Sequence, residues 1–180
     1  MSLYSVFGLQ GVLMFVVSLP VSLGQRDTGA GAGFVALAGF VVWAVGLYFE
    51  AVGDAQLARF KRDPRNDGLI MDTGLWALTR HPNYFGDCLV WWGLAIVASA
   101  QGAGVWAFLG AAVMTVLLVR VSGVAMLDRL LAKRKPGYAE YMARTSAFIP
   151  LTKRSARVRT ARPARPTRQR LLDRESLQER

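Results

Sequence analysis

The chain has 180 residues, of which 53% are hydrophobic and 19% are charged, and its net charge is +10. Soluble domains of this length rarely have so large an apolar fraction, and here the charged residues are clustered between long apolar stretches. The composition therefore favours an all-α integral membrane protein. A single cysteine excludes an intramolecular disulfide, and a single histidine without a cysteine cluster argues against a metal site.

Four apolar stretches predict about four transmembrane helices: residues 3–23, 34–52, 84–100 and 105–121. The first is uncharged and lacks the basic start of a signal peptide, so we expect a retained helix, with a kink tolerated near Pro20. The short turn at 101–104 makes the last two stretches an antiparallel hairpin.

Two shorter helices are predicted after the fourth stretch. Residues 126–135 place leucines on one side and charges on the other, which is typical of an amphipathic helix at a membrane interface. Pro136 and Gly137 end it, and residues 138–144 suggest a further short helix. The chain thus divides into a transmembrane domain, 1–150, and a tail, 151–180, whose composition predicts disorder.

The position of the charges predicts the orientation in the membrane. Residues 153–180 include ten basic and three acidic residues, so this tail supplies most of the net charge. A basic tail after a membrane helix favours contact with anionic lipid headgroups over nucleic acid. The other basic residues concentrate between the second and third stretches and after the fourth, which places those segments and both termini in the cytoplasm.

Acidic residues at the end of the second stretch are the first candidate site residues. Glu50 and Asp54 lie four residues apart and share a helix face. Acids at membrane depth are costly unless they are paired or hydrated. They either form ion pairs with Arg59, Lys61 or Arg80, or orient a polar ligand.

The segment from Thr79 to Asp87 is the densest candidate site. Pro82 suits a first helical turn, and the free N–H groups there, together with Arg80, would attract a phosphate or carboxylate. His81, the only histidine, is able to donate or accept a proton. Tyr84 and Asp87 would share one face. The alternative is an ordinary capped helix start.

Aromatic residues further along have two interpretations each. Trp91 and Trp92 lie in the middle of the third stretch, where packing between helices is favoured over cofactor contact. Tyr138 and Tyr141, three residues apart, either bind a ligand or anchor their helix at the interface. The cysteine of the third stretch, Cys88, is expected to be a small buried residue.

These motifs resemble the domain-of-unknown-function 1295 (DUF1295) family of bacterial proteins, which are relatives of the steroid 5-alpha-reductase C-terminal domain. The resemblance covers about residues 5–150. It rests on Gly74-Leu75-Trp76, on Thr79-Arg80-His81-Pro82-Asn83-Tyr84-Phe85-Gly86-Asp87, on Trp91-Trp92-Gly93, and on Arg134-Lys135-Pro136-Gly137-Tyr138 with Phe148-Ile149-Pro150.

The resemblance implies a cofactor pocket that faces the cytoplasm and is built from the last helices. The wider superfamily includes sterol reductases, which use NADPH, and isoprenylcysteine carboxyl methyltransferases, which use S-adenosylmethionine. By resemblance, the residues contacting the cofactor are Arg80, His81, Asn83, Tyr84, Asp87, Asp128, Tyr138 and Tyr141, with Glu50, Asp54 and Gln56 approaching from the second stretch.

The leading hypothesis is an NADPH-dependent membrane oxidoreductase, in the bacterial inner membrane, that reduces a carbon–carbon double bond of a steroid- or lipid-like substrate. Its candidate catalytic residues are His81, Tyr84 and Tyr138. The first alternative is an S-adenosylmethionine-dependent carboxyl or lipid methyltransferase. The second is a truncated or non-catalytic membrane subunit, because family members are usually longer. A homo-oligomer or a missing N-terminal half would then complete the pocket.

Overall fold

The computed structural model describes residues 3–25, 33–121 and 124–151. Every regular element within them is helical, and extended backbone pairs only at an isolated bridge between Thr79 and Ser146. The predicted all-α fold is therefore confirmed. The predicted disorder of the tail concerns residues that, after Leu151, lie outside the described part of the chain.

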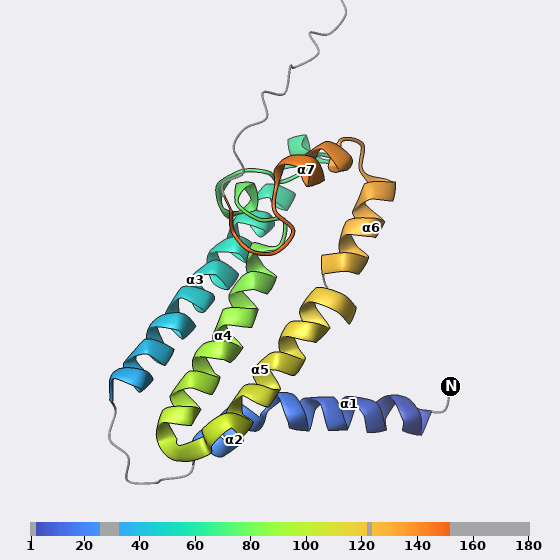
Figure 1. Cartoon of the computed structure of the whole chain (residues 1–180). Helices are drawn as coiled ribbons and strands as arrows, with labels where there is room; N and C mark the ends of the chain where they lie inside the picture. The colour runs from blue at the N-terminus through green and yellow to red at the C-terminus, as the bar shows by residue number, and fades with distance from the viewer. Residues whose placement is uncertain (1–2, 26–32, 122–123, 152–180) are drawn as a thin grey trace, which may run out of the picture.

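Three long helices form the body of the molecule (Figure 1). They are α3 (Phe34–Arg62), α4 (Pro82–Ala98) and α5 (Ala107–Val116). The predicted hairpin joins α4 to α5 through η3 (Ser99–Ala103) and η4 (Gly104–Trp106). Gly102 and Gly104 have φ of 88° and 60°, a region that favours glycine, and this reverses the chain.

Two helical runs of the described residues are long and apolar enough to cross a membrane. One is α3. The other is the run from Pro82 to Arg134, which includes α4, the hairpin, α5, η5 (Leu117–Val121) and α6 (Val124–Arg134). By length and composition these runs indicate a membrane protein. They do not confirm four separate crossings, which remain a prediction.

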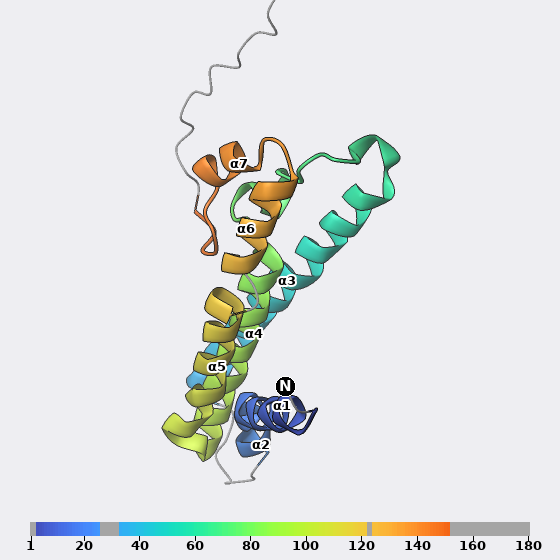
Figure 2. The same ribbon diagram turned by 90° about the vertical axis from the view of Figure 1, so that its right-hand side faces the viewer.

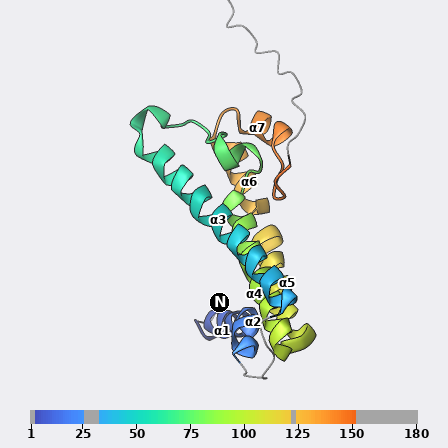
Figure 3. The same ribbon diagram turned by 90° about the vertical axis from the view of Figure 1, so that its left-hand side faces the viewer.

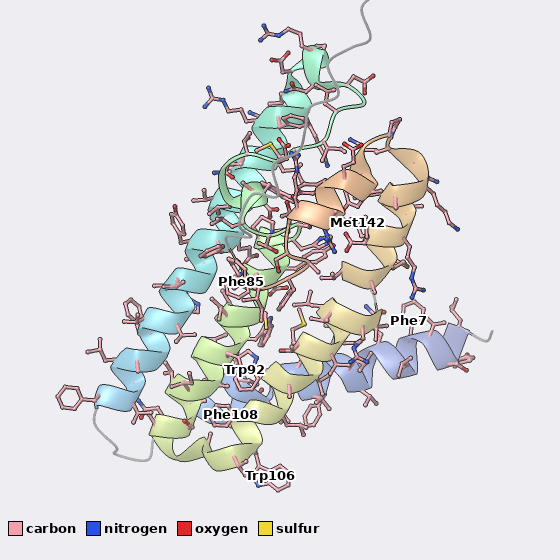
Figure 4. All side chains as sticks on the ribbon, turned by 45° about the horizontal axis from the view of Figure 1, so that its top comes forward. Phe7, Phe85, Trp92, Trp106, Phe108 and Met142 are labelled. Carbon is pink, nitrogen blue, oxygen red and sulfur yellow. The ribbon has the colours of Figure 1, made fainter. Side chains whose placement is uncertain are left out.

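The first stretch is interrupted close to Pro20, where a kink was expected. It is divided at Ser18 into α1 (Leu3–Val17) and α2 (Leu19–Gly24). Pro20 lies in the first turn of α2, and because it has no N–H and its ring would clash with the preceding turn, a continuous helix is disfavoured there. As Figures 1 and 2 show, α1 runs crosswise to α3–α5. Figure 4 shows Phe7 on this projecting helix.

The second stretch was predicted to end at residue 52, but α3 continues to Arg62. We had assigned the basic residues after position 52, such as Arg59 and Lys61, to the loop between the second and third stretches. The helix ends instead at Asp63, whose backbone is extended because the following Pro64 disfavours a helical conformation for the residue before it. Arg59, Lys61 and Arg62 in the last turn suit the negative end of the helix dipole.

Glycines bring α3 and α4 into close contact. The buried residues of α3 include Gly39, Gly46 and Gly53, spaced by seven. Gly39 faces Gly93 of α4 and Gly46 faces Gly86. A Cβ atom on Gly46 would lie 2.7 Å from the carbonyl oxygen of Gly86, and one on Gly93 would lie 2.5 Å from the amide nitrogen of Trp43. Small residues at an interface let the backbones of membrane helices approach closely.

The packing of α4 against α5 agrees with the expectations for Trp92 and Cys88. The indole Nε1 of Trp92 donates to Oγ1 of Thr115 at 3.0 Å, and its ring packs against Phe108, as seen in Figure 4. Cys88 is buried, with its sulfur 3.3 Å from the same hydroxyl. Around them, small side chains form the tightest core: Ala95, Ala98, Ala107 and Ala111.

The helices predicted after the fourth stretch are present as α6 and α7 (Tyr138–Arg144). Gly137, at φ 81°, makes the turn between them. Figures 1 and 3 show α7 beside the loop that connects α3 to α4, at the end of the molecule opposite α1 and α2. That loop contains η1 (Pro64–Asn66) and η2 (Gly74–Ala77). This end concentrates the predicted site residues.

Candidate functional site

A buried polar cluster centres on the carboxylate of Asp128 in α6. Its Oδ2 accepts from Nη2 of Arg80 at 2.7 Å, and its Oδ1 accepts from the hydroxyl of Tyr138 at 2.7 Å. The Nε2 atom of His81 lies 3.1 Å from the same Oδ1. These four residues are at most 8% exposed. A buried carboxylate with three partners fixes α6 and α7 against the start of α4.

The guanidinium of Arg80 is engaged within the protein. Its Nη1 donates to the carbonyl oxygens of Met142 and Thr145, both at 2.9 Å, at the end of α7. Its Nη2 carries the ion pair with Asp128, and Nε is buried with no partner among the described residues. We had expected Arg80 and the free N–H groups of the α4 start to attract an anion. Instead, Arg80 already has its counterion, and the α4 start packs against Gly53 of α3.

His81 is held in its neutral form. Burial lowers its pKa below the usual 6.5, the charge of Arg80 lowers it further, and the hydrogen bond to Asp128 opposes this in part. With a carboxylate at Nε2, the hydrogen-bond network assigns the proton to that nitrogen, which leaves Nδ1 as an acceptor. The imidazole stacks on the ring of Tyr84, with centroids 5.4 Å apart and planes 7° apart.

A pH titration of stability tests this assignment. Because the pKa of His81 is lower in the folded chain, protonation favours the unfolded state, and stability should fall as the pH drops below about 6.5. We expect the melting midpoint of the purified protein to be level between about pH 7 and 8 and to decrease below that range. His81→Gln keeps a donor toward Asp128 and should flatten the slope between about pH 7 and 5.5. An equal slope in both proteins would contradict the assignment.

The tyrosines of the cluster differ in what their hydroxyls do. Tyr138 donates to Asp128, and Tyr141 donates to the carbonyl oxygen of Trp76 at 2.6 Å. Burial raises the pKa of both phenols, so both stay protonated. Trp76 in turn donates from Nε1 to the carbonyl oxygen of Gly53 at 3.0 Å, which links α7 through η2 to α3. Within the described ranges Tyr84 makes no hydrogen bond through its hydroxyl.

A cavity of about 330 Å³ adjoins this cluster, and we call it the α7 cavity. Three of its lining residues are cations, Lys61, Arg80 and Lys135, and no carboxylate of the described residues lines it. Nζ of Lys135 donates to the carbonyl oxygen of Leu69 at 2.6 Å. Apolar and aromatic side chains make up most of the wall, which is completed by Leu57, Ile70, Met71, Trp76, His81, Leu127, Leu131, Tyr138 and Tyr141.

The predicted site residues separate into two groups. One group lines the α7 cavity: Arg80, His81, Tyr138 and Tyr141. Asp128 does not line it but is the hydrogen-bond partner of Arg80, His81 and Tyr138. The others lie elsewhere. Nδ2 of Asn83 donates to Oδ1 of Asp54 at 2.9 Å, and Oε1 of Gln56 accepts from the amide of Leu75 at 3.0 Å. The remaining predicted residues, Glu50, Tyr84 and Asp87, are not among those that line the cavity.

Sequence reasoning named Lys61 as a cation for a phosphorylated dinucleotide, but it missed the leucines and Lys135 of the cavity wall. Leu57 and Lys61 are four residues apart on α3, and Leu127, Leu131 and Lys135 repeat the same spacing along α6 and its end. Residues four apart share a helix face. In both helices, leucine at intervals of four is followed by a lysine. This pattern is visible in the sequence and could have predicted a cavity with an apolar wall and lysines at its edge.

Comparison with known proteins defines the class. The family described as "Protein of unknown function (DUF1295)" matches residues 1–145, and the chain belongs to this family. The resemblance deduced from the motifs is thus confirmed. No solved structure matches the chain.

Two curated proteins share a shorter region with it. One is the probable O-methyltransferase ustE of Ustilaginoidea virens, 38% identical over 63 residues, or 35% of this chain and 22% of that protein. The other is the steroid 5-alpha-reductase DET2 of Arabidopsis thaliana, 35% identical over 71 residues, or 39% of this chain and 27% of that protein. The matched regions span about a quarter of the length of these relatives.

Proposed function

We propose that the chain is an NADPH-dependent membrane oxidoreductase that reduces a carbon–carbon double bond of a steroid- or lipid-like substrate. The observation that carries this proposal is the α7 cavity, which combines three cations, aromatic walls and no lining carboxylate. The similarity to a steroid 5-alpha-reductase supports an oxidoreductase at the level of the family.

The chemistry of the cavity wall fits a phosphorylated dinucleotide. Because Asp128 neutralises Arg80, the cations left for a ligand are Lys61 and Lys135, and Lys135 spends only one of its N–H donors on Leu69. Ammonium groups are suitable partners for phosphate oxygens. The indole of Trp76 and nearby phenol rings offer surfaces for a flat heterocycle, and the volume lies within the range of small-ligand sites.

In this proposal the chain's own residues supply the proton and the orientation. Bound NADPH would supply a hydride to one carbon of the double bond. Tyr84 does not line the cavity but stacks on His81, which does; from this position it would give its hydroxyl proton to the other carbon and regain one from water, since the hydroxyls of Tyr138 and Tyr141 already donate within the protein. Stacking on His81 would orient Tyr84, and Asp128 would keep His81 in its neutral tautomer.

We further propose that all four apolar stretches enter the bacterial inner membrane and that the α7 cavity opens to the cytoplasm, where both termini also lie. Basic residues at the end of α3 and on α6 support this orientation. The basic tail would lie near anionic headgroups, and the substrate would arrive from the lipid. A second copy or a separate N-terminal segment would complete the substrate side.

A methyltransferase is the second candidate because ustE, a probable O-methyltransferase, shares part of the chain. S-Adenosylmethionine carries a net positive charge, because its sulfonium and ammonium groups outweigh its carboxylate, and Lys61 and Lys135 would repel it overall. The charge of the cavity therefore favours the reductase. A non-catalytic membrane subunit would bind neither cofactor.

Calorimetric titration of the detergent-purified chain with NADPH, and separately with S-adenosylmethionine, tests the proposal. We expect NADPH to bind and Lys61→Gln to weaken it about tenfold, because a charge-assisted contact is lost. Arg134→Gln, on α6 but away from the cavity wall, is the matched control and should bind as the wild type does. Tyr84→Phe should bind NADPH normally, since its hydroxyl acts only in proton transfer.

The other outcomes separate the candidates. Binding of S-adenosylmethionine without NADPH would assign the chain to the methyltransferases. Binding of neither, by a protein with a sharp melting transition, would favour the non-catalytic subunit.

A further inference from the structure

A second hollow lies beside the end of α3, and we call it the α3 hollow. Its volume is about 450 Å³. Met71 lines both this hollow and the α7 cavity, but the two use different faces of α3: Leu57 and Lys61 face the cavity, while Gln56 and Arg59 face the hollow. The wall comprises Gln56, Arg59, Phe60, Arg62, Asp63, Asn66, Met71 and Thr73.

Hydrogen-bond donors dominate what the α3 hollow offers to a ligand. Neither Arg59 nor Arg62 forms an ion pair or a hydrogen bond within the described residues. The amide oxygen of Gln56 accepts from Leu75, so the amide nitrogen is the end that remains to donate. The hollow therefore presents two guanidinium groups and one side-chain amide as donors, and such groups bind phosphate oxygens.

Two acceptors that would repel an anion there are already used. Asp63 is the one acid in the wall, and both of its oxygens accept from Arg65, at 2.8 to 3.2 Å. The carbonyl oxygen of Phe60, at the negative end of the helix dipole, accepts from Nδ2 of Asn66 at 2.9 Å. These local contacts offset part of the negative charge at the end of α3.

We propose that the α3 hollow is a phosphate-binding site, distinct from the α7 cavity, in which Arg59 and Arg62 hold the phosphate and Gln56 donates to it. This goes beyond the proposed reductase function. The chemistry is that of a terminal phosphate group, and its source is either the headgroup of an anionic lipid at the membrane surface or a soluble phosphate compound.

Two binding experiments on the full chain distinguish these sources. Native mass spectrometry of the detergent-solubilised protein would measure binding of phosphatidic acid against phosphatidylcholine. Calorimetry would measure binding of inorganic pyrophosphate. We expect phosphatidic acid to bind more tightly than phosphatidylcholine, and the double variant Arg59→Gln/Arg62→Gln to weaken this at least tenfold. Binding of phosphatidic acid alone identifies a lipid headgroup, and pyrophosphate binding of similar strength identifies a soluble phosphate.

Matched variants keep the test independent of the reductase proposal. Lys61→Gln, in the wall of the α7 cavity alone, and Arg134→Gln, in neither wall, should leave phosphate binding unchanged. Arg65→Gln should weaken it although Arg65 does not line the hollow, because the charge of Asp63 is then released. NADPH binding should be unchanged in the double variant.

The proposal is overturned if neither ligand binds, or if the double variant binds like Arg134→Gln at an unchanged melting midpoint. It is also overturned if the double variant loses NADPH as well, since the hollow would then belong to the cofactor site. Failure of NADPH to bind the wild type would instead reject the reductase function and leave the phosphate result standing.

Discussion

Gly86→Ala is expected to force α3 and α4 apart and to lower the melting midpoint of the purified chain markedly. A Cβ atom at this position would lie 2.6 Å from the carbonyl oxygen of Gly46 and would also meet the backbone nitrogen of Glu50. Backbone atoms in the middle of a helix cannot move aside as a flexible side chain can. Overpacking of this kind costs about 1–3 kcal/mol and sometimes more. Thermal unfolding in detergent, followed by tryptophan fluorescence, measures the change.

Gly11→Ala in α1 is the matched control. An added Cβ at Gly11 meets nothing within 4 Å, and alanine is better than glycine inside a helix by about 1 kcal/mol. The same substitution should therefore leave the midpoint unchanged or raise it slightly. If Gly86→Ala melted at the temperature of Gly11→Ala, the close contact of α3 with α4 would not be a determinant of stability.

This interface illustrates what the sequence could and could not predict about the fold. Apolar runs predicted the helices, and Gly102 with Gly104 marked the hairpin. The true end of α3 at Arg62 was missed because polar residues beyond the apolar run resemble a loop until packing holds them in a helix. The seven-residue spacing of glycines in α3 was visible in the sequence, but its meaning depends on α4 presenting Gly86 opposite Gly46.

The candidate site shows a similar division. The motif from Thr79 to Asp87 and the later tyrosines directed attention to Arg80, His81 and Tyr138, which the structure places together. Their common partner, Asp128, is 48 residues from Arg80 in the chain, and no local pattern predicts which charge it meets. Consequently Arg80 was expected to bind an anionic ligand, whereas the structure gives it an internal carboxylate.

Removing that carboxylate should have the largest effect on the site. In Asp128→Asn, the guanidinium of Arg80 would keep its two carbonyl partners but lose the one counterion that the described residues give it, at a position that is 8% exposed. Breaking a buried ion pair by removing one partner typically costs about 3–5 kcal/mol. Tyr138 and His81 would lose a charged acceptor at the same time. We expect a strongly lowered melting midpoint, or failure to purify as a folded protein.

Two further variants separate the role of Asp128 from a general effect of lost charge. Glu140→Gln, on the exposed side of α7, removes the same charge and should melt as the wild type does. Asp128→Glu keeps the charge and should recover much of the midpoint, because the longer acid still reaches Arg80. If Asp128→Asn melted like Glu140→Gln, Arg80 would be stable without its counterion. Arg80 would then not need Asp128 for stability, and the anionic ligand that we first expected would better explain why an arginine is buried at this position.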